Sequence, residues 1–353
     1  MAAEMDGLAT LVCGAFSSNA QRSKESGETI YRIPAGRSYE SYGQMFLAEQ
    51  QLPQNQRMDF VVIATPNYLH YPVAIAALDA GFHVVCDKPV AFNVEEASAL
   101  QSKVGECGLK FALTHNYTGY PMIREARALI QEGKLGTIRR VNCEYLQGWL
   151  AQPMQDNKQA DWRTDPERAG AAGCFGDIGS HAENLMSYVT GLKIEALCAD
   201  TTTFVHGRKL EDDGNVLLRF AGGAKGMLSV SQIALGKEND LKLQVFGHRA
   251  SIEWCQDDAN SLIVRHAGAP MQVFRSGWAG TGAHSSAATR LPPGHPEGYL
   301  EAFAEVYRNF CNHLLGVADS ADYPSIAEGV RGMRFIESVV ASAEKGAQWV
   351  TLD

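Results

Sequence analysis

The chain has 353 residues, of which 45% are hydrophobic and 20% are charged, and its formal net charge is −9. A chain of this length can form two domains with separate cores. It contains no apolar run of the roughly 20 residues that a membrane-spanning helix needs. The acidic balance, with no cluster of Lys and Arg, argues against nucleic-acid binding.

The eight cysteines are scattered along the chain and form no Cys-x-x-Cys pair, and several lie inside apolar runs. This distribution predicts reduced, buried thiols in a cytoplasmic protein, rather than disulfides or a zinc site. We therefore expect no metal ion in the functional site.

The first residues predict the end of a helix, closed by Gly7, and then a strand from residue 8 to residue 16. Residues 20 to 58 predict a short helix, a Gly/Pro-containing loop and a polar helix from about residue 38 to residue 51. None of these segments carries a catalytic motif by itself.

Residues 59 to 89 form the central pattern of the chain. An unbroken apolar run ends at Thr65-Pro66-Asn67, residues 70 to 80 are rich in helix formers, and a second apolar run ends at Asp87-Lys88-Pro89. Strand, helix and strand in about 30 residues predict one βαβ unit with parallel strands. Ligands of such sheets bind beyond the carboxyl ends of the strands, where both polar turns fall.

A third polar turn follows the next strand. Residues 93 to 107 predict a helix, and a short strand from residue 109 to residue 113 ends at Thr114-His115-Asn116-Tyr117. A helix from residue 121 to residue 132 then leads to a different kind of sequence. We therefore expect a dinucleotide-binding domain at residues 1–120 and a second domain at residues 121–353.

After residue 138 the apolar and polar residues alternate, as in a sheet with one wet face. The strands expected there cover residues 138–149, 193–205, 214–221, 224–234, 240–248, 250–255, 260–266 and 271–275. Helices are expected at residues 299–315 and 326–345, before a short strand at 349–352. The predicted fold class is therefore a Rossmann-type α/β domain followed by a large, mainly antiparallel open-sheet α+β domain.

The stretch Gly173-Cys174-Phe175-Gly176-Asp177-Ile178-Gly179-Ser180-His181 is the second specific pattern. If a helix begins near Asp177, His181 lies four residues later on the same face, so a carboxylate and an imidazole point into one cleft. The alternative is that Asp177 only caps the helix and His181 is a structural histidine.

These motifs together resemble the Gfo/Idh/MocA oxidoreductases. The resemblance rests on Ala-Thr-Pro-Asn followed by His70, on the acid-Lys-Pro strand end at Lys88, and on the helix start between Asp177 and His181. It extends over nearly the whole chain. Members of this family are nicotinamide-dependent dehydrogenases and reductases of sugars, cyclitols and related polyols. The resemblance implies this activity, and an open sheet through which subunits pair.

The expected catalytic residues are Lys88, Asp177 and His181. Oxidation of a secondary alcohol removes a hydride from carbon and a proton from oxygen, and His181 suits the role of base, with Asp177 orienting it or binding a neighbouring hydroxyl. Lys88 can donate to the reacting oxygen and stabilise its developing charge. Pro89 restricts the backbone at Lys88 and permits a cis bond. A solvated surface lysine is the alternative for Lys88.

Polar residues at the strand ends are the candidate cofactor contacts: Ser17, Ser18, Arg22, Thr65, Pro66, Asn67, His70, Asp87, Lys88 and Asn116. His70 lies in a first helical turn and can equally be structural. An NAD enzyme usually places an acidic residue where Ser17 and Ser18 stand. The hydroxyls and Arg22 suit the 2′-phosphate of NADP, which we expect in preference to NAD, although an ordinary helix cap explains the same residues.

Aromatic faces and fixed donors suit the hydroxyls of a polyol. The expected substrate contacts are Lys88, Tyr117, Trp162, Arg163, Asp177, His181 and His295. His295 lies in a Gly-His-Pro-Glu-Gly turn that resembles a pocket loop of one branch of the family. A plain turn, with Glu297 as a cap, explains the same residues.

One part of the family pattern has no counterpart. The first strand and its Gly-x-Gly-x-x-Gly turn, which would supply backbone N–H groups to the pyrophosphate, do not precede the strand expected at residues 8–16. Either the given start lies inside a longer protein, as a Met within an apparent helix interior favours, or the chain has lost tight cofactor binding.

Two other functions remain open at this point. The chain could be a catalytically inactive cofactor- or sugar-binding protein, or an NAD-assisted glycosidase of the same fold. The expected partners are a small-molecule polyol and a second copy of the chain, as a homodimer or homotetramer through the C-terminal sheet, with no nucleic acid and no membrane.

Overall fold

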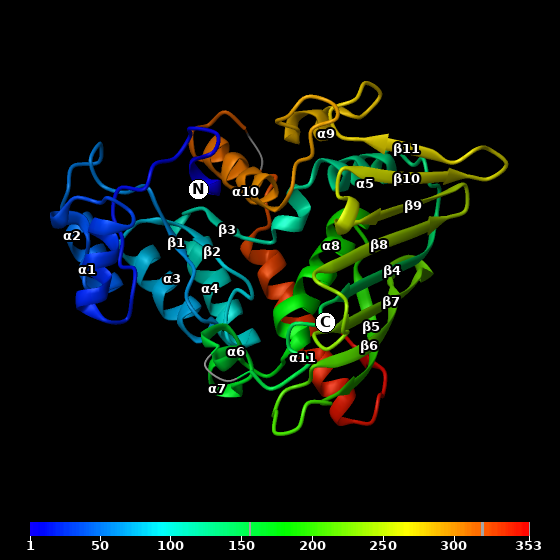
Figure 1. The fold of residues 1–353 in the computed structure, drawn as a ribbon, viewed down its shortest axis with the longest axis horizontal. Coiled ribbons are helices and arrows are strands. Elements are labelled where there is room, and N and C mark those ends of the chain that lie inside the picture. Colours follow the sequence, from blue (N-terminus) through cyan, green and yellow to red (C-terminus); the bar gives the residue numbers. More distant parts are fainter. Residues whose placement is uncertain (155–156, 319–320, 353) are drawn as a thin grey trace.

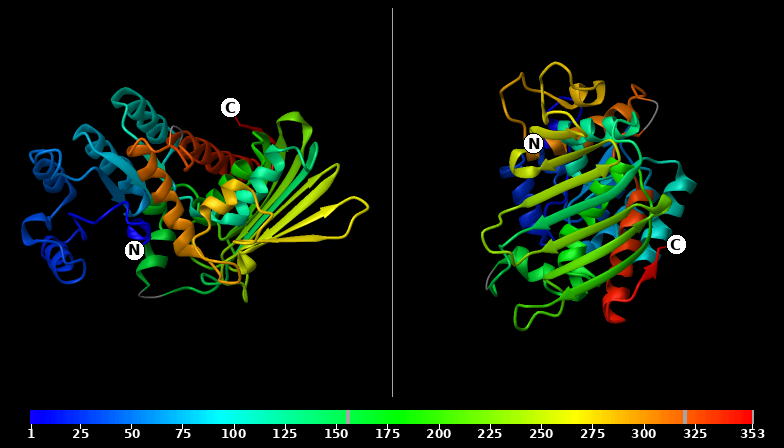
Figure 2. Two further views of the ribbon diagram at one scale, coloured as in Figure 1. Left: turned by 90° about the horizontal axis from the view of Figure 1, so that it is seen from above. Right: turned by 90° about the vertical axis from the view of Figure 1, so that its right-hand side faces the viewer.

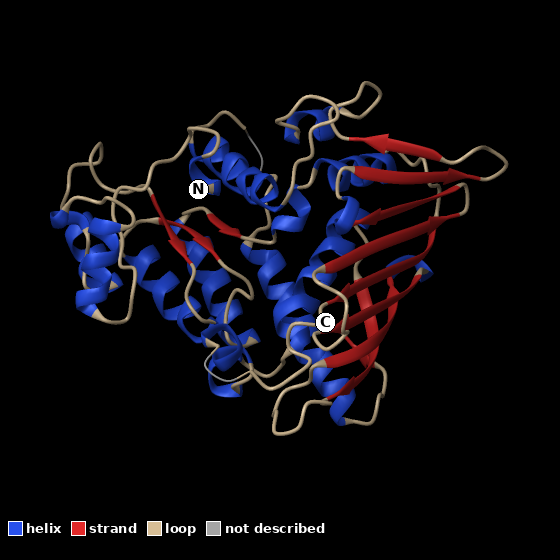
Figure 3. Cartoon of the chain, viewed as in Figure 1, coloured by secondary structure: helices blue, strands red, loops and turns tan. Residues whose placement is uncertain are grey.

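The computed structural model describes residues 1–154, 157–318 and 321–352. It contains two sheets at opposite ends of the molecule, with helices around the smaller sheet and on one side of the larger one (Figures 1 and 3). Among the described residues, no helix is long and apolar enough to cross a membrane.

The smaller sheet has three parallel strands in the order β1-β2-β3, namely Phe60–Ile63, His83–Cys86 and Phe111–Leu113. Helix α3 (His70–Asp79) connects β1 to β2, and α4 (Val94–Cys107) connects β2 to β3. The apolar runs form strands here because their side chains are almost fully buried between helices. The predicted βαβ unit and its parallel pairing are confirmed.

The strand expected at residues 8–16 is wrong. This segment is extended, but its only sheet-like contact among the described residues is an isolated bridge between Gly14 and Ser38. Leu8 and Leu11 remain 39% and 42% exposed. A strand needs a neighbour that satisfies its backbone groups along its length, and among the described contacts of this segment only Gly14 exchanges hydrogen bonds with another backbone, at Arg37 and Tyr39. The apolar pattern of residues 8–16 is therefore not sufficient to make this segment a strand.

The helices around this segment are short. A 3₁₀ turn, η1 (Ala2–Glu4), opens the chain in place of the expected helix end, and α1 (Ala20–Thr29), η2 (Ala35–Arg37) and α2 (Tyr42–Glu49) follow. Asn19 caps α1 by accepting a hydrogen bond from the backbone N–H of Arg22. The short helix and the polar helix predicted for residues 20 to 58 are thus confirmed.

The larger sheet has nine strands in the order β11-β10-β9-β8-β4-β7-β6-β5-β12. All neighbours pair antiparallel except β4 and β7, which are parallel. The predicted open, mainly antiparallel sheet is confirmed. The strands are β4 (Ile138–Leu146), β5 (Ile194–Thr202), β6 (Asp213–Phe220), β7 (Lys225–Ser231), β8 (Asp240–Gly247), β9 (Ala250–Cys255), β10 (Ser261–His266), β11 (Gln272–Arg275) and β12 (Val350–Thr351).

Helices cover one face of this sheet, and none of the helices in the described part of the chain lies over the other face (Figure 2). The covering helices include α5 (Pro121–Gln131), α8 (Ser180–Thr190) and α11 (Ile326–Glu344). The alternation of buried and exposed residues along β6 follows from this arrangement. Leu217, on the uncovered face of β6, is 52% exposed.

The end of the chain returns to the smaller sheet. Helix α10 (Tyr299–Leu314) contributes Val306 and Phe310 to a buried cluster with Val85 of β2 and Ala112 of β3. The two parts of the chain therefore share a core and hold the carboxyl ends of β1, β2 and β3 close to α8. The remaining short elements are η3 (Asn67–Leu69), η4 (Asn116–Gly119), α6 (Lys158–Arg163), α7 (Pro166–Ala169), η5 (Phe175–Gly179), η6 (Ala221–Gly223), η7 (Gln256–Asp258) and α9 (Ala283–Ala288).

Candidate active site

The turns after β1, β2 and β3 meet at one sheet edge. Thr114, after β3, donates its hydroxyl to Asp87, after β2. His70 lies between the first two turns, with Nδ1 2.6 Å from the carbonyl oxygen of Pro89 and Nε2 2.9 Å from that of Thr65. The Lys88–Pro89 peptide bond is cis. The clustering of polar strand ends, inferred from the βαβ pattern, is therefore present in the fold.

Lys88 and Asp177 form the ion pair at the centre of the site. Lys88 Nζ lies 2.8 Å from Asp177 Oδ1 and also donates to the backbone carbonyl of Asp177. The other carboxylate oxygen, Oδ2, accepts from Arg163 Nε at 3.1 Å and from Gln232 Nε2 at 2.9 Å. The side chains of Lys88 and Asp177 are only 12% and 16% exposed. Two cations and one amide therefore converge on one carboxylate.

The charges at this carboxylate determine its protonation. Burial alone would raise the pKa of Asp177, but the positive charges of Lys88 and Arg163 outweigh it and lower that pKa to about 2. Asp177 is therefore ionised at neutral pH. With two cations beside one anion, the group carries a net positive charge, which favours negative charge on a neighbouring oxygen.

The segment that carries Asp177 is a single π-helical turn, η5, that runs directly into α8. The backbone N–H of Ser180 bonds to the carbonyl of Phe175, five residues earlier. The sequence predicted an α-helix beginning near Asp177, so the wider turn is a difference. Such π-turns occur mostly inside longer helices and often at functional sites. Here the turn directs Asp177 to Lys88, while His181 lies in the first turn of α8.

His181 is buried, with 9% of its surface exposed. Its Nδ1 lies 3.4 Å from Nδ1 of His115, and the two rings are nearly perpendicular at 89°. Burial, with the nearby charge of Lys88, lowers the pKa of His181 well below 6.5. The imidazole is therefore neutral at neutral pH. Lys88, Asp177 and His181 thus lie in one region, whereas the expected orientation of His181 by Asp177 is replaced by a contact with His115.

A network of neutral polar groups lies beside His181. The ring of Tyr117 packs edge-on against the imidazole at 4.9 Å between centroids. The hydroxyls of Tyr117 and Tyr145 are 2.5 Å apart, and Asn239 contacts both, at 3.0 and 2.8 Å. Gln147 donates to the same Asn239 at 2.5 Å. The expected substrate residue Tyr117 is therefore adjacent to His181.

Sequence reasoning missed His115, Tyr145, Gln232 and Asn239. His115 could have been selected, since it stands in the polar turn after β3. Tyr145 faces inward on an alternating strand, which is also the pattern of an ordinary core residue. Gln232 and Asn239 follow or precede strands of the larger sheet and carry no local signal.

Two of the predicted cofactor residues present buried polar atoms without partners. Thr65 Oγ1 and both side-chain polar atoms of Asn116 have no hydrogen-bond partner within the described part of the chain. Unpaired buried polar groups are costly, so these atoms fit a ligand that offers donors and acceptors at this edge. A nicotinamide riboside has such groups, and the residues present therefore fit that half of a dinucleotide.

Other predicted cofactor residues have structural contacts. The Asn67 amide donates to the carbonyl of Ala169, the last residue of α7, at 2.9 Å. His70 is 1% exposed, and both of its nitrogens face backbone carbonyls, which is the structural role that the sequence left open. Pro66 precedes the turn η3.

Ser17, Ser18 and Arg22 lie at the start of α1. The Ser17 hydroxyl accepts from the backbone N–H of Asn19 at 3.1 Å, and Asn19 caps the helix. The side chains of Ser18 and Arg22 are exposed. The helix-cap alternative therefore describes the local contacts, and the choice between NAD and NADP is a separate question.

Of two further predicted substrate residues, Trp162 lies beside the site, whereas His295 has no described contact with it. The Arg163 guanidinium lies 4.2 Å from the centroid of the Trp162 ring. Because Arg163 also pairs with Asp177, Trp162 lies next to the site. His295 is exposed, and its ring contacts the carbonyl of Pro292 in its own turn. Glu297 holds that turn by accepting from the backbone of Arg290 at 2.5 Å. The plain-turn alternative fits His295, and no contact among the described residues links it to the site.

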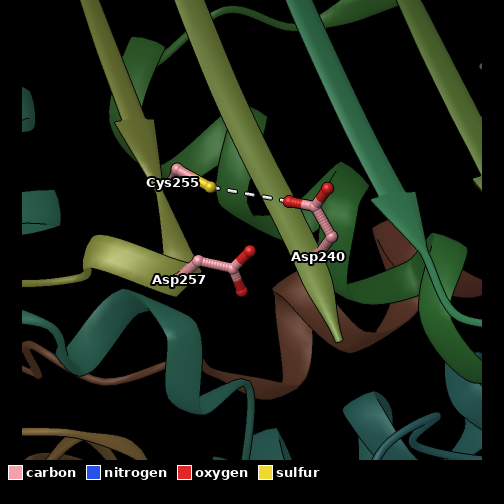
Figure 4. A group of neighbouring side chains, drawn as sticks. All are labelled: Asp240, Cys255 and Asp257. Atoms are coloured by element: carbon pink, nitrogen blue, oxygen red, sulfur yellow. Dashed lines mark hydrogen bonds between the residues drawn. The ribbon is translucent and has the colours of Figure 1, made fainter. Parts of the chain in front are cut away.

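A second cluster contains possible metal ligands, namely Asp240, Cys255 and Asp257 (Figure 4). Asp240 already pairs with the ammonium of Lys237 and accepts from the Cys255 thiol at 3.5 Å. Burial raises the pKa of Cys255, so the thiol stays protonated at neutral pH. A protonated thiol and a neutralised carboxylate are poor ligands, and the cluster is explained by its internal contacts.

The chain matches known domain families along most of its length. Residues 5–115 match the family described as "Oxidoreductase family, NAD-binding Rossmann fold". Residues 123–253 match the "GFO/IDH/MocA C-terminal domain". The two ranges correspond to the smaller sheet with its surroundings and to most of the larger sheet.

Among solved structures, an inositol dehydrogenase homologue from Azotobacter vinelandii in complex with NAD⁺ has a TM-score of 0.93 and 34% sequence identity. The match covers 97% of this chain and 90% of that one. Another structure of such a homologue from the same organism, with NADH and myo-inositol, has a TM-score of 0.91, 33% identity and the same coverage.

Two bacterial oxidoreductases are also similar to this chain in sequence. The oxidoreductase YfiI of Bacillus subtilis is 33% identical over 351 residues, covering 96% of this chain and 88% of its own length. Levoglucosan dehydrogenase of Pseudarthrobacter phenanthrenivorans is 30% identical over 317 residues, covering 82% and 79%.

Proposed function

We propose that this chain, which belongs to the Gfo/Idh/MocA oxidoreductase family, transfers a hydride between a nicotinamide cofactor and a ring hydroxyl of an uncharged sugar or cyclitol. The resemblance inferred from the strand-end motifs is confirmed by relatives that match nearly the whole chain. The observation that carries the proposal is the meeting of an ammonium from the smaller sheet, Lys88, with Asp177 and the neighbouring His181 of the second domain.

Lys88 and Asp177 bind and polarise the reacting hydroxyl in this proposal. The Lys88 ammonium, oriented by the carboxylate of Asp177, donates a hydrogen bond to the substrate oxygen. The net positive charge contributed by Arg163 stabilises the negative charge that develops there. Because Asp177 stays ionised, it holds Lys88 in the same place at any pH above about 3.

His181 takes the proton of the substrate hydroxyl. Its lowered pKa keeps the imidazole neutral at pH 7, and a neutral imidazole can accept a proton, whereas an imidazolium cannot. In the reverse direction, the protonated ring returns the proton to the carbonyl oxygen. The buried position of His181 excludes water from the proton transfer.

Thr65, Asp87 and Asn116 would hold the nicotinamide end of the cofactor. The unpartnered atoms of Thr65 and Asn116 support this assignment. When bound, the nicotinamide supplies the hydride acceptor or donor. Asn67, Pro66 and His70 support the assignment indirectly, since they fix the turns on which these groups lie.

The preference for NADP rests on Ser17, Ser18 and Arg22 alone. Residues 15–22, which follow the extended segment, include no carboxylate to bind a ribose 2′-hydroxyl, and the exposed Arg22 guanidinium suits a phosphate. The Azotobacter relative, in contrast, holds NAD⁺. Titration of the protein with NADH and with NADPH, followed by the fluorescence of the reduced nicotinamide, decides between them: tighter binding of NADPH supports the prediction, and tighter binding of NADH contradicts it.

A neutral polyol is the substrate class that fits the lining beside His181. Tyr117, Tyr145 and Asn239 offer hydroxyl and amide groups without net charge. The cations next to them, Lys88 and Arg163, both pair with Asp177, and in this proposal their excess positive charge serves the reacting oxygen rather than a separate anionic group of the substrate. Relatives that act on or bind levoglucosan and myo-inositol support the same class.

The test is turnover of a panel of neutral polyols, with myo-inositol and levoglucosan included, followed by absorbance of the reduced nicotinamide. We expect oxidation of at least one neutral ring alcohol and a much lower kcat/KM for phosphorylated analogues. Binding of neither dinucleotide would contradict the proposal. Cleavage of a glycoside without net alcohol oxidation would replace it with the glycosidase alternative.

We also propose that copies of the chain associate through the uncovered face of the nine-stranded sheet, as a dimer or tetramer in the cytoplasm. The exposed Leu217, which points away from the buried side of β6, supports the interface. Free cysteines throughout the described chain support a reducing compartment. Light scattering measures the mass in solution of the wild type and of Leu217→Lys and so tests the interface. A monomeric wild type would contradict it.

A further inference from the structure

His115 and His181 face each other through the same type of nitrogen. Their Nδ1 atoms are 3.4 Å apart, the ring centroids are 5.2 Å apart, and the ring planes are nearly perpendicular. His115 is 4% exposed and follows β3, whereas His181 lies on α8 in the second domain. A contact between residues 66 positions apart in the sequence thus joins the two parts of the site.

A neutral imidazole carries one N–H, either on Nδ1 or on Nε2. Two Nδ1 atoms can share a hydrogen bond only if one of them is protonated and the other is not. The pair therefore requires opposite tautomers. If His115 donates, His181 carries its proton on Nε2 and cannot act there as a base; if His181 donates, its Nε2 has a free lone pair.

We propose that His115 is a positioning residue that accepts a hydrogen bond from Nδ1–H of His181 and so leaves Nε2 of His181 free as the catalytic base. This inference rests on the proposed function, which requires a base at His181. Asp177 cannot set the tautomer in its place, because its two oxygens bond to Lys88, Arg163 and Gln232.

The proton and electron balance agrees with this arrangement. On oxidation of the alcohol, the C–H bond breaks with its electron pair and the hydride passes to the nicotinamide, while the O–H bond breaks and its proton goes to Nε2 of His181. The C=O bond forms, and His181 becomes an imidazolium. That imidazolium keeps its Nδ1–H bond to His115, which stabilises the charged ring.

The surroundings favour a neutral acceptor at His115. Lys88 and Arg331 contribute positive charge near His115, which opposes a second proton on its ring. The other groups near His181 are the charge of Lys88 and the phenols of Tyr117 and Tyr145, whereas the carboxylate of Asp177 bonds to Lys88, Arg163 and Gln232. The two phenols pack against the ring of His181 at 4.9 and 6.4 Å between centroids and hydrogen bond to each other.

The first test reads the tautomer directly, without turnover. In protein labelled with ¹⁵N-histidine, the signals of His181 are identified by their loss in His181→Gln. We expect the wild type to show protonated Nδ1 and unprotonated Nε2 at neutral pH. His115→Phe should shift the population toward protonated Nε2, and His115→Gln, whose side-chain carbonyl can accept the same bond, should keep the original tautomer. Protonated Nε2 in the wild type, or an unchanged tautomer in His115→Phe, would overturn the proposal.

The second test uses steady-state kinetics on the same variants. We expect His115→Phe to lower kcat by about 10–100-fold, the range seen when a metal-bound histidine loses the partner that fixes its tautomer, with dinucleotide affinity unchanged. The acid limb of its pH profile should move to lower pH, because the imidazolium of His181 loses an acceptor. His115→Gln should recover most of kcat.

Equal losses in both variants, with an unshifted acid limb, would mean that His115 has only a packing role, and would overturn the proposal. Melting curves show whether each variant is folded before it is assayed. If the wild type oxidises no polyol at all, the proposed function fails, whereas the tautomer measurement still decides the role of His115.

Discussion

Two largely buried charge clusters join the two parts of this chain, and both consist of carboxylates surrounded by cations, but with different results. In the first, Lys88, Arg163 and Gln232 converge on Asp177 next to a neutral imidazole. The second, which we call the Glu305 network, connects the first residues of the chain to α10 and α5. Its members are Asp6, Arg124, Arg290, Glu305, Arg308 and Asp322.

Charges alternate in sign through the Glu305 network. Arg290 lies 2.6 Å from Asp6 and 3.2 Å from Glu305, and Arg308 contacts the same two carboxylates at 3.2 and 3.5 Å. Arg124 continues the network from Glu305 to Asp322. Glu305 and Arg124 are 2% and 5% exposed, so their charges depend on each other rather than on water.

The clusters differ in whether they leave a hydrogen-bonding group free to contact a substrate. Each carboxylate of the Glu305 network contacts at least two guanidinium groups, with Arg127 as the second partner of Asp322, so the network only fixes positions. At Asp177, by contrast, one carboxylate holds an ammonium that retains further hydrogen-bonding capacity, next to an imidazole that is neutral because it is buried. We therefore expect changes in the first cluster to affect rate, and changes in the second to affect stability.

The largest expected effect is that of Lys88→Ala. Removal of the ammonium takes away the group that stabilises charge on the reacting oxygen, and we expect kcat to fall by about 10³-fold, the upper part of the range for loss of one such donor. Dinucleotide affinity should change little. Rapid-mixing kinetics and fluorescence titration measure the two quantities.

Lys103→Ala is the matched control for Lys88. Lys103 also pairs with a carboxylate, Asp79, at 2.5 Å, but on the surface of the same domain. It should leave kcat unchanged. An equal loss of kcat and dinucleotide affinity in Lys88→Ala would mean that the lysine mainly supports cofactor binding.

Glu305→Ala should have the largest effect on stability. It leaves the buried guanidinium of Arg124 with Asp322 alone, and removal of one partner from a buried ion pair costs about 3 kcal/mol or more. Urea unfolding measures this loss, and kcat per folded molecule should stay close to wild type below the transition. If kcat fell as much as in Lys88→Ala, the separation of the two clusters into chemical and structural roles would be wrong.

Local sequence patterns predict part of this fold and site, but not all of it. Local patterns predicted the βαβ unit and nearly every strand of the larger sheet, because alternation and apolar runs record burial directly. The same reasoning placed Lys88 at a strand end and His181 near Asp177. The strand at residues 8–16 failed, since a strand also requires a partner that the local pattern does not show.

Contacts between distant residues had no local signal. Gln232 reaches Asp177 from the end of β7, His115 reaches His181 across the domains, and Asp6 reaches Arg290 across most of the chain. Each depends on how the two sheets are arranged. No local pattern singled out Arg124 and Glu305, which the fold buries as an ion pair.

The buried His115 should make the free energy of unfolding depend on pH. Burial, with the charges of Lys88 and Arg331, lowers the pKa of His115 to about 3, so below pH 6.5 the unfolded chain binds a proton that the folded chain does not. Stability should therefore fall as pH drops, by about 2 kcal/mol at pH 5 for this residue. His115→Gln should make the decline between pH 7 and pH 5 shallower by that amount in urea unfolding.

Asp177 does not contribute in the same window. Because its pKa is lowered to about 2, its contribution to stability is present above pH 3.8 and is lost only as the pH falls toward 2. A decline between pH 7 and pH 5 that persists unchanged in His115→Gln would therefore assign the effect to other histidines, such as His70, whose pKa burial also lowers.

The smallest expected effect separates the two cations on Asp177. In Arg163→Ala, the pKa of Asp177 should rise from about 2 toward 3.8, yet the carboxylate stays ionised at pH 7 and still orients Lys88. The Arg163 side chain is 24% exposed, so loss of its ion pair should change kcat at pH 7 by only a few-fold. Below pH 5, kcat should fall earlier than in the wild type, as Asp177 takes up a proton. A loss as large as that in Lys88→Ala would show that the guanidinium, rather than the ammonium, stabilises the reacting oxygen.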